Sequence, residues 1–170
     1  MARDRLPQIP ERLVARLWES RARLQRELRT QGGARIRVLY PGRPSSTAGP
    51  DFRDALLETD GRQVRGDVEV HVCPGDWESH GHHRDPSYNG VVLHVALNPG
   101  PRPTSPLASG GEAPLLPLST QMEGLDGVPE MVPAGQYLWG LLGKRLPAPR
   151  SWEEAEALLA RAGDARFEAR

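Results

Sequence analysis

The stretch Gly66-Asp67-Val68-Glu69-Val70-His71-Val72 alternates valines with two acids and a histidine. Successive side chains of a β-strand point to opposite faces, so this stretch predicts a strand with one apolar and one polar face. The polar face would carry Asp67, Glu69 and His71, with residues two apart separated by roughly 6.6 Å. Any half-exposed antiparallel strand shows the same alternation, so a purely structural interpretation fits the pattern as well.

A further acid lies eighteen positions before Glu69, in Pro50-Asp51. If Asp51 approaches from a neighbouring strand, the two carboxylates can share one divalent cation. Hard cations such as Mg²⁺ take oxygen ligands and retain water, and a metal-activated water can attack a phosphodiester. We therefore expect a hydrolytic site with Mg²⁺ or Mn²⁺ bound by Asp51 and Glu69, in which His71 orients or deprotonates the water.

All the histidines of the chain, five in number, fall between positions 71 and 94. Imidazole is a common metal ligand and the usual general base near neutral pH. One interpretation places four residues of this segment on the substrate side of the acidic site: His80, His82, His83 and Asp85. A second is a zinc site formed by His80, His83 and Asp85 with a bound water. A third gives the histidines hydrogen-bonding roles only.

The remaining pattern predicts an α/β domain. Apolar residues at helical spacing indicate a helix, period-two stretches indicate strands, and Asp60-Gly61 is typical of a hairpin turn. The expected elements are a helix at 10–30, strands at 34–40, 51–59, 63–72 and 91–97, a short helix within 74–90 and a brief strand at 115–118. We expect a mixed central sheet, with the last strand buried on both faces.

Changes in composition divide the chain into three parts. Residues 1–97 are expected to form the core, residues 98–118 a Pro/Gly-rich loop or linker, and residues 119–170 an irregular and helical extension. Ser151 and Glu154 form a capping box for a helix at 151–162. Because the chain stops soon afterwards, we expect this helical region to be truncated.

Composition and charge limit the class of protein. No stretch is apolar enough to span a membrane, no hydrophobic signal core follows the first residues, and Cys73 is the only cysteine. A cytoplasmic protein is therefore the default. Residues 1–43 carry 11 arginines against 4 acids, although the net charge of the chain is zero. A basic first quarter fits a nucleic-acid partner and a solvated helix face equally well.

Several motifs occur together within residues 10–97. They are Gly49-Pro50-Asp51-Phe52, Gly66-Asp67-Val68-Glu69-Val70-His71, Asp76-Trp77, His80-Gly81-His82-His83-Arg84-Asp85-Pro86, Tyr88 and Val92-Leu93-His94-Val95. In this combination they resemble an uncharacterised bacterial family known only as a domain of unknown function. The resemblance implies a longer protein with a helical C-terminal region, and it implies no particular activity.

Asp51, Glu69 and the expected order of elements are also similar to the PD-(D/E)xK nuclease superfamily, whose core is αβββαβ. This resemblance implies metal-site roles for Asp51, Glu69 and, on the first helix, Glu11. His71 stands where that motif has a lysine. A neutral imidazole beside a metal does not reproduce the fixed positive charge of lysine.

The sequence therefore predicts a metal-dependent phosphodiester hydrolase acting on nucleic acid, with Mg²⁺ or Mn²⁺ as cofactor and Zn²⁺ as the alternative. Its expected fold is an αβββαβ nuclease-like core with a mixed central sheet, followed by a loop-rich and helical C-terminal segment. Nucleic acid is the expected partner, and no membrane association is expected. Two rival functions remain: a zinc-dependent hydrolase centred on His80, His83 and Asp85, and a non-catalytic nucleic-acid-binding or scaffold module.

Overall fold

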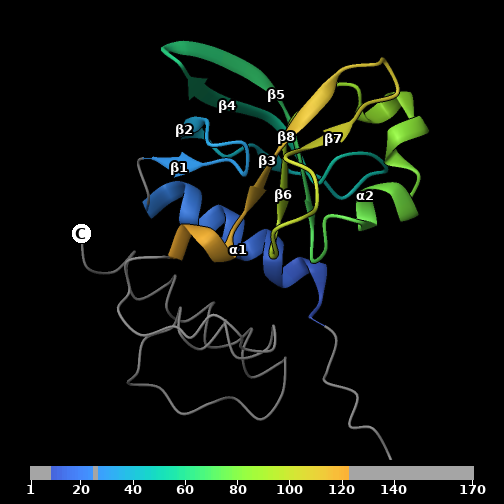
Figure 1. The fold of residues 1–170 in the computed structure, drawn as a ribbon, viewed down its shortest axis with the longest axis horizontal. Coiled ribbons are helices and arrows are strands. Elements are labelled where there is room, and N and C mark those ends of the chain that lie inside the picture. Colours follow the sequence, from blue (N-terminus) through green and yellow to red (C-terminus); the bar gives the residue numbers. More distant parts are fainter. Residues whose placement is uncertain (1–8, 25–26, 123–170) are drawn as a thin grey trace, which may run out of the picture.

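The computed structural model describes residues 9–24 and 27–122, which form a curled mixed sheet with few helices (Figure 1). The eight strands follow the order β1-β2-β4-β5-β6-β8-β7, with β3 paired to β4. The strands are β1 (Leu28–Arg29), β2 (Arg35–Tyr40), β3 (Arg43–Pro44), β4 (Phe52–Thr59), β5 (Arg62–His71), β6 (Val91–Ala96), β7 (Thr104–Pro106) and β8 (Glu112–Pro117). The helices are α1 (Glu11–Leu24), α2 (Asp76–Ser79) and the 3₁₀ helices η1 (His82–Arg84), η2 (Pro86–Tyr88) and η3 (Ser119–Met122).

The sheet changes from antiparallel to parallel at β5. Strands β2, β4 and β5 form an antiparallel meander, whose β4–β5 turn contains Asp60 and Gly61 at positive φ. Strand β6 runs parallel to β5 and to β8. Because parallel neighbours need a crossover connection, residues 72–90 cross over the sheet as α2, η1 and η2. The expected mixed sheet is thus confirmed, and the strands expected at 34–40, 51–59, 63–72 and 91–97 correspond to β2, β4, β5 and β6.

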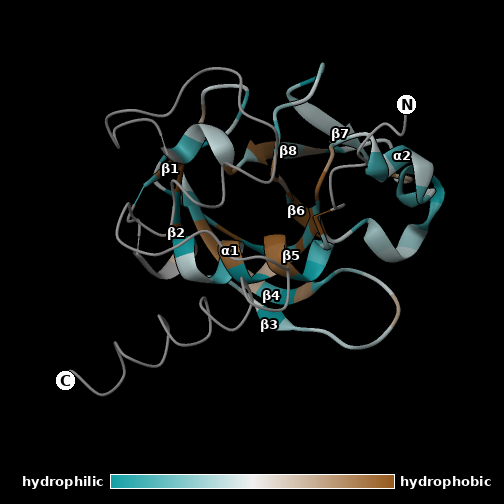
Figure 2. Cartoon of the chain, turned by 90° about the horizontal axis from the view of Figure 1, so that it is seen from below, coloured by the Kyte–Doolittle hydropathy of each residue, from teal (hydrophilic) through white to brown (hydrophobic). Residues whose placement is uncertain are grey.

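The main core lies between α1 and one face of the sheet. Apolar residues of α1 at helical spacing pack against β5 and β6, as expected for an amphipathic helix on a sheet. The central residues of this cluster are Leu13, Val14, Leu17, Trp18, Val68, Val70, Leu93 and Val95. Figure 2 shows hydrophobic residues concentrated on α1, β5, β6 and β8. Since Val68 and Val70 belong to this core, Glu69 and His71 point to the opposite face of β5.

The crossover segment covers that opposite face. Its Trp77 is fully buried, packs with Tyr88 and Val91, and donates a hydrogen bond from Nε1 to the carbonyl of Pro106 in β7 at 2.8 Å. As a result, Glu69 is 5% and His71 1% exposed. The polar face of β5 is therefore an enclosed site, whereas the alternation of residues alone is equally typical of a half-exposed strand.

The end of the predicted first helix was wrong. Helix α1 stops at Leu24 in the described part of the chain, and Leu28 pairs with Ile36 as part of β1. Leu28 is 1% exposed as a residue of this strand, so its apolar side chain is not part of the apolar face of α1.

The segment at 98–118 contains the brief strand expected at 115–118, which is longer than expected and is not alone in this Pro/Gly-rich stretch. Residues 104–106 and 112–117 form the antiparallel β7–β8 pair, and β8 lies beside β6 in the sheet. Buried Leu115 and Leu116 anchor β8, so part of this segment belongs to the sheet. Of the expected extension at 119–170, the structure describes only η3, and the helix expected at 151–162 lies outside the described residues. None of the described helices has the length and apolar character needed to cross a lipid bilayer.

Gly66 marks a close approach between β5 and β6. A Cβ at Gly66 would clash with Cγ1 of Val92 and lie 2.6 Å from the carbonyl oxygen of Gly90. We predict that Gly66→Ala lowers the free energy of unfolding by about 1–3 kcal/mol, because the β6 backbone must shift. Urea denaturation measures this change. Gly75→Ala is the matched control, since Gly75 has φ −66° and open space around the added Cβ. Equal destabilisation by both variants would contradict the close-approach argument.

Candidate functional site

Asp51 and Glu69 meet where β4 begins beside β5. The backbone N–H of Asp51 donates to Oε2 of Glu69 at 3.0 Å, and the backbone N–H of Val70 donates to Oδ2 of Asp51 at 3.1 Å. These reciprocal bonds fix both carboxylates next to the register shift that follows Phe52. Each carboxylate retains one oxygen that these two bonds do not use, Oδ1 of Asp51 and Oε1 of Glu69.

Three histidine rings gather beside Oε1 of Glu69. His71 lies two residues further along β5, whereas His80 and His82 come from the crossover segment. One ring nitrogen from each of the three lies within 4.8 Å of the others. Oε1 of Glu69 lies 3.3 Å from Nε2 of His82 and 3.6 Å from Nε2 of His71. We call this group, His71, His80, His82 and Glu69, the imidazole pocket.

A chain of polar side chains runs from the imidazole pocket into the core. Nδ1 of His71 lies 2.9 Å from Nε2 of His94, and Nδ1 of His94 lies 2.7 Å from Oγ of Ser105. The direction of these hydrogen bonds depends on the histidine tautomers. Meanwhile, Nε2 of His71 and Nε2 of His82 are buried without a hydrogen-bond partner. Buried polar atoms are nearly always paired, so these two nitrogens, which face one carboxylate oxygen, are open to a water molecule or a ligand; Nδ1 of His83 is likewise buried without a partner.

Glu11 lies near the same pocket, in the first turn of α1. Partial burial raises the pKa of Glu11, while the charges of His80 and Asp51 act on it in opposite directions. Its charge in turn contributes to the raised pKa of Glu69. The structure therefore brings Glu11, Asp51, Glu69 and His71 into one neighbourhood, although their catalytic and metal-binding roles stay predictions.

The electrostatics of the pocket disfavour charge. Burial, together with the Asp51 carboxylate, raises the pKa of Glu69 to about 8. Burial also lowers the pKa of His71 to about 2 and that of His94 to about 3, so both rings are neutral. The positive charge of Arg53, whose guanidinium is paired with Asp67 at 2.9 Å, only partly offsets this rise. Such strongly shifted groups gathered in one pocket are typical of a functional site.

His83 and Asp85 do not join the imidazole pocket. Asp85 is exposed, and its carboxylate accepts a hydrogen bond from the backbone N–H of Ser87 at 2.9 Å, so it caps η2. His83 is half-buried and lies outside the group formed by His71, His80 and His82. The described residues thus assemble a different histidine set from the predicted His80, His83 and Asp85.

As a polar side chain on an otherwise apolar strand, His94 is expected from the sequence to be a satisfied core histidine. The structure bears this out, since His94 is fully buried and both of its ring nitrogens have hydrogen-bond partners, but the sequence did not show that it links His71 to Ser105. Ser105 carried no signal, because only the folding of β7 over the sheet brings it to His94. Which histidine of His82 and His83 faces the pocket depends on the rotation of η1, which spacing does not fix.

One comparison with known proteins gave a match. The family model described as "Protein of unknown function (DUF2851)" matches residues 11–103, more than half of the chain. The chain belongs to the DUF2851 family. The region matched by DUF2851 contains every residue of the imidazole pocket, as well as Glu11, Asp51 and His94, whereas Ser105 lies just beyond it. No curated protein and no solved structure matches the chain, and the resemblance to PD-(D/E)xK nucleases stays a prediction.

The raised pKa of Glu69 predicts how stability depends on pH in chelator-treated protein. A carboxylate whose pKa is raised in the folded state favours folding when protonated, so its contribution is lost as pH rises from about 4.5 to about 8. We predict that Glu69→Gln raises the free energy of unfolding by about 1–3 kcal/mol at pH 8 and changes it little at pH 5. The glutamine oxygen can still accept the Asp51 N–H.

Chemical denaturation at the two pH values measures this difference. Glu27→Gln is the control, because Glu27 is exposed and paired with exposed Arg35 at 3.6 Å. Exposed pairs contribute little, so this variant should match the parent at both pH values. Destabilisation of the chelated protein by Glu69→Gln at pH 8 would show that burial of this carboxylate carries no cost.

Proposed function

We propose that this chain is a metal-dependent hydrolase that cleaves the phosphodiester bonds of nucleic acid. The observation that carries the proposal is the meeting of Asp51 and Glu69 beside the unpartnered Nε2 of buried His71. Two carboxylates held this close, one buried and one half-buried, favour a bound cation, which would neutralise them. A bound cation also makes water acidic enough to serve as a nucleophile near neutral pH.

The order of elements supports a phosphodiester as the substrate. With the two-residue strands β1 and β3 set aside, α1, β2, β4, β5, the crossover and β6 have the αβββαβ order of PD-(D/E)xK nucleases. Asp51 directly precedes the second of the three antiparallel strands, and Glu69 and His71 lie on the third. Glu11 lies on the first helix. These are the positions to which the resemblance assigns the metal site.

The surface beside Asp51 suits a phosphate backbone. A hollow of about 550 Å³ opens between the β3–β4 connection and β5, and its lining combines two arginines and three hydroxyl side chains with two carboxylates: Arg43, Pro44, Ser45, Ser46, Thr47, Arg53, Asp54 and Asp67. Arg43 is largely exposed, and its pairing with Asp54 at 3.8 Å is weak. Arginine and hydroxyl groups are frequent contacts to phosphate oxygens, so this hollow would orient the strand without reading its sequence.

In the proposed reaction, a water molecule attacks the phosphorus atom, and a cation held beside Asp51 and Glu69 would supply the charge that makes this water acidic enough to react. A new P–O bond forms to the water oxygen, and the P–O bond to the leaving sugar oxygen breaks. The proton released by water passes to a pocket carboxylate or to solvent, and the leaving oxygen takes up a proton. His71 is neutral and buried, so in this scheme it binds or orients, and the positive charge that lysine supplies in the nuclease motif comes from the cation.

Removal of the Asp51 charge tests the proposal. The full chain, first treated with chelator, is assayed on bis(p-nitrophenyl) phosphate and on single- and double-stranded DNA and RNA with Mg²⁺, Mn²⁺ or Zn²⁺. We predict cation-dependent cleavage, and a loss of at least roughly 100-fold in kcat for Asp51→Asn, because the site loses one of its charged groups. Asparagine keeps an oxygen that can accept the Val70 N–H, so the fold should survive.

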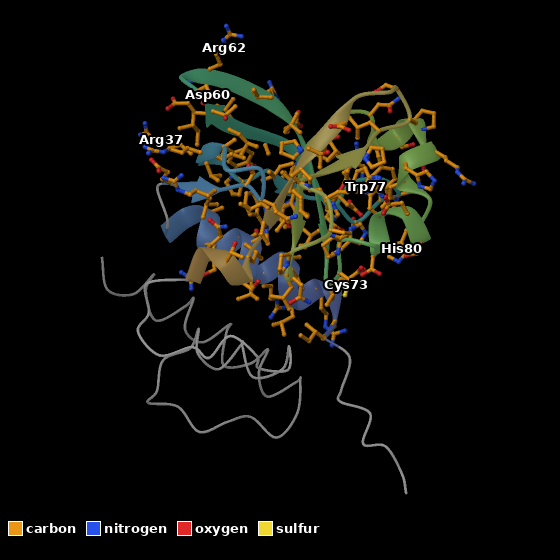
Figure 3. All side chains as sticks on the ribbon, in the orientation of Figure 1. Arg37, Asp60, Arg62, Cys73, Trp77 and His80 are labelled. Atoms are coloured by element: carbon orange, nitrogen blue, oxygen red, sulfur yellow. The ribbon has the colours of Figure 1, made fainter. Side chains whose placement is uncertain are left out.

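Asp60→Asn is the matched control. Asp60 lies at the tip of the β4–β5 hairpin, away from the crossover segment with Trp77 and His80 (Figure 3). Its φ of 49° is one that asparagine also adopts readily. No cleavage with any of the three cations, or equal rates for Asp51→Asn and the parent, would refute the proposed hydrolase. Oligonucleotide binding without cleavage would instead identify a non-catalytic binding module.

A further inference from the structure

The distances around Glu69 fit a coordination shell better than a set of hydrogen bonds. Oε1 of Glu69 lies 3.3 Å from Nε2 of His82 and 3.6 Å from Nε2 of His71, and neither nitrogen has a hydrogen-bond partner. Hydrogen bonds between nitrogen and oxygen are usually 2.7–3.2 Å long. Ligands bound tetrahedrally to a metal at 2.0–2.1 Å lie roughly 3.3–3.4 Å from one another. Each nitrogen therefore lies at about the distance from Oε1 that separates two ligands of one ion.

We propose that Nε2 of His71, Nε2 of His82 and Oε1 of Glu69 bind one transition-metal ion of the Zn²⁺ class, with His80 as the fourth, exposed ligand. Imidazole nitrogens suit Zn²⁺, whereas Mg²⁺ requires an octahedral shell of oxygen ligands. The inference rests on the proposed function only in naming its metal, and the binding of the metal does not depend on any reaction. Asp51 stands beside this ligand set and outside it, because its backbone N–H holds the other oxygen of Glu69. It replaces the predicted His80, His83 and Asp85 set with residues that the fold brings together.

The buried ligands are held in position before any ion binds. The chain from His71 through His94 to Ser105 fixes the plane of the His71 ring. If Nδ1 of His71 donates to His94, Nε2 keeps its lone pair directed into the pocket, which is the usual arrangement of a metal-binding histidine. The His82 ring stacks on Tyr88 with a centroid distance of 3.8 Å. Glu69 is fixed through its other oxygen by the Asp51 N–H.

His80 differs from these three because it is exposed. Its ring nitrogen lies within 4.8 Å of those of His71 and His82, so a side-chain rotation can complete the shell. Being on the solvent side, it is also the ligand that a water or a phosphate oxygen can displace. A site with three fixed ligands and one exchangeable position is the arrangement of catalytic zinc.

Titration of chelator-treated full chain with Zn²⁺, Mn²⁺ and Mg²⁺ tests the site by isothermal calorimetry, with Co²⁺ absorption as a report of tetrahedral nitrogen ligation. We expect one Zn²⁺ per chain, which millimolar Mg²⁺ does not displace. His82→Phe keeps the stacking on Tyr88 and should weaken Zn²⁺ binding at least roughly 100-fold, and His80→Ala at least roughly 10-fold. His83→Ala, a histidine one residue from His82, should bind Zn²⁺ like the parent.

Several results would overturn the inference. These are no Zn²⁺ binding by the folded parent, equal losses in His83→Ala and His82→Phe, and unchanged binding in His80→Ala and His82→Phe, both checked for folding by circular dichroism. The outcomes also separate this inference from the proposed hydrolase. Zinc bound without any phosphodiester cleavage sustains the site and rejects the hydrolase. Cleavage with Mg²⁺ that survives His80→Ala and His82→Phe sustains the hydrolase and overturns the inference that this ion is its metal.

Discussion

The C-terminal end of strand β5, from Val68 to His71, is buried on both of its faces, and the rest of the site follows from that constraint. One face gives Val68 and Val70 to the core under α1, while the other gives Glu69 and His71 to an enclosed pocket. Removing a carboxylate from water is costly unless hydrogen bonds or opposite charges compensate. The backbone N–H of Asp51 supplies one such bond, and Asp51 itself is held by the N–H of Val70. This reciprocal pair ties β4 to β5 where their ladder is irregular.

The part of this desolvation cost that hydrogen bonds do not offset is concentrated at Oε1 of Glu69. This oxygen faces two imidazole nitrogens that have no partners, in a place where burial keeps both His71 and Glu69 uncharged. A metal ion would favour the ionised form of Glu69 and the neutral form of His71, since it binds carboxylate and neutral imidazole together. Ion binding would then also stabilise the crossover segment, because its ligands His80 and His82 come from that segment and Glu69 from the sheet.

The sequence predicted what depends on short-range periodicity. The alternation over 66–72 located β5 and its polar face, Asp60-Gly61 located the hairpin, and the spacing of Asp51 and Glu69 anticipated two acids on neighbouring strands. The sequence did not predict features that depend on how a helical turn is rotated or on how side chains pack. The face on which His82 lies is set by one turn of η1 and by stacking on Tyr88, and neither has a periodic signature. The predicted C-terminal end of the first helix was wrong for a related reason. Leu28 lies four positions after Leu24, and an apolar residue at that spacing fits a helix and a paired strand equally well.

The β7–β8 pair shows why the site extends beyond its obvious motifs. Ser105 on β7 is the hydrogen-bond partner of Nδ1 of His94, and Pro106 accepts the bond from Nε1 of Trp77, the residue around which the crossover packs. Strand β8 pairs with β7 on one side and with β6 on the other, and so attaches these two residues of β7 to the sheet. The DUF2851 match ends at residue 103, just before these contacts begin. The matched region therefore supplies the imidazole pocket itself, whereas the orientation of His94, and through it of His71, depends on a segment whose composition alone is typical of a linker.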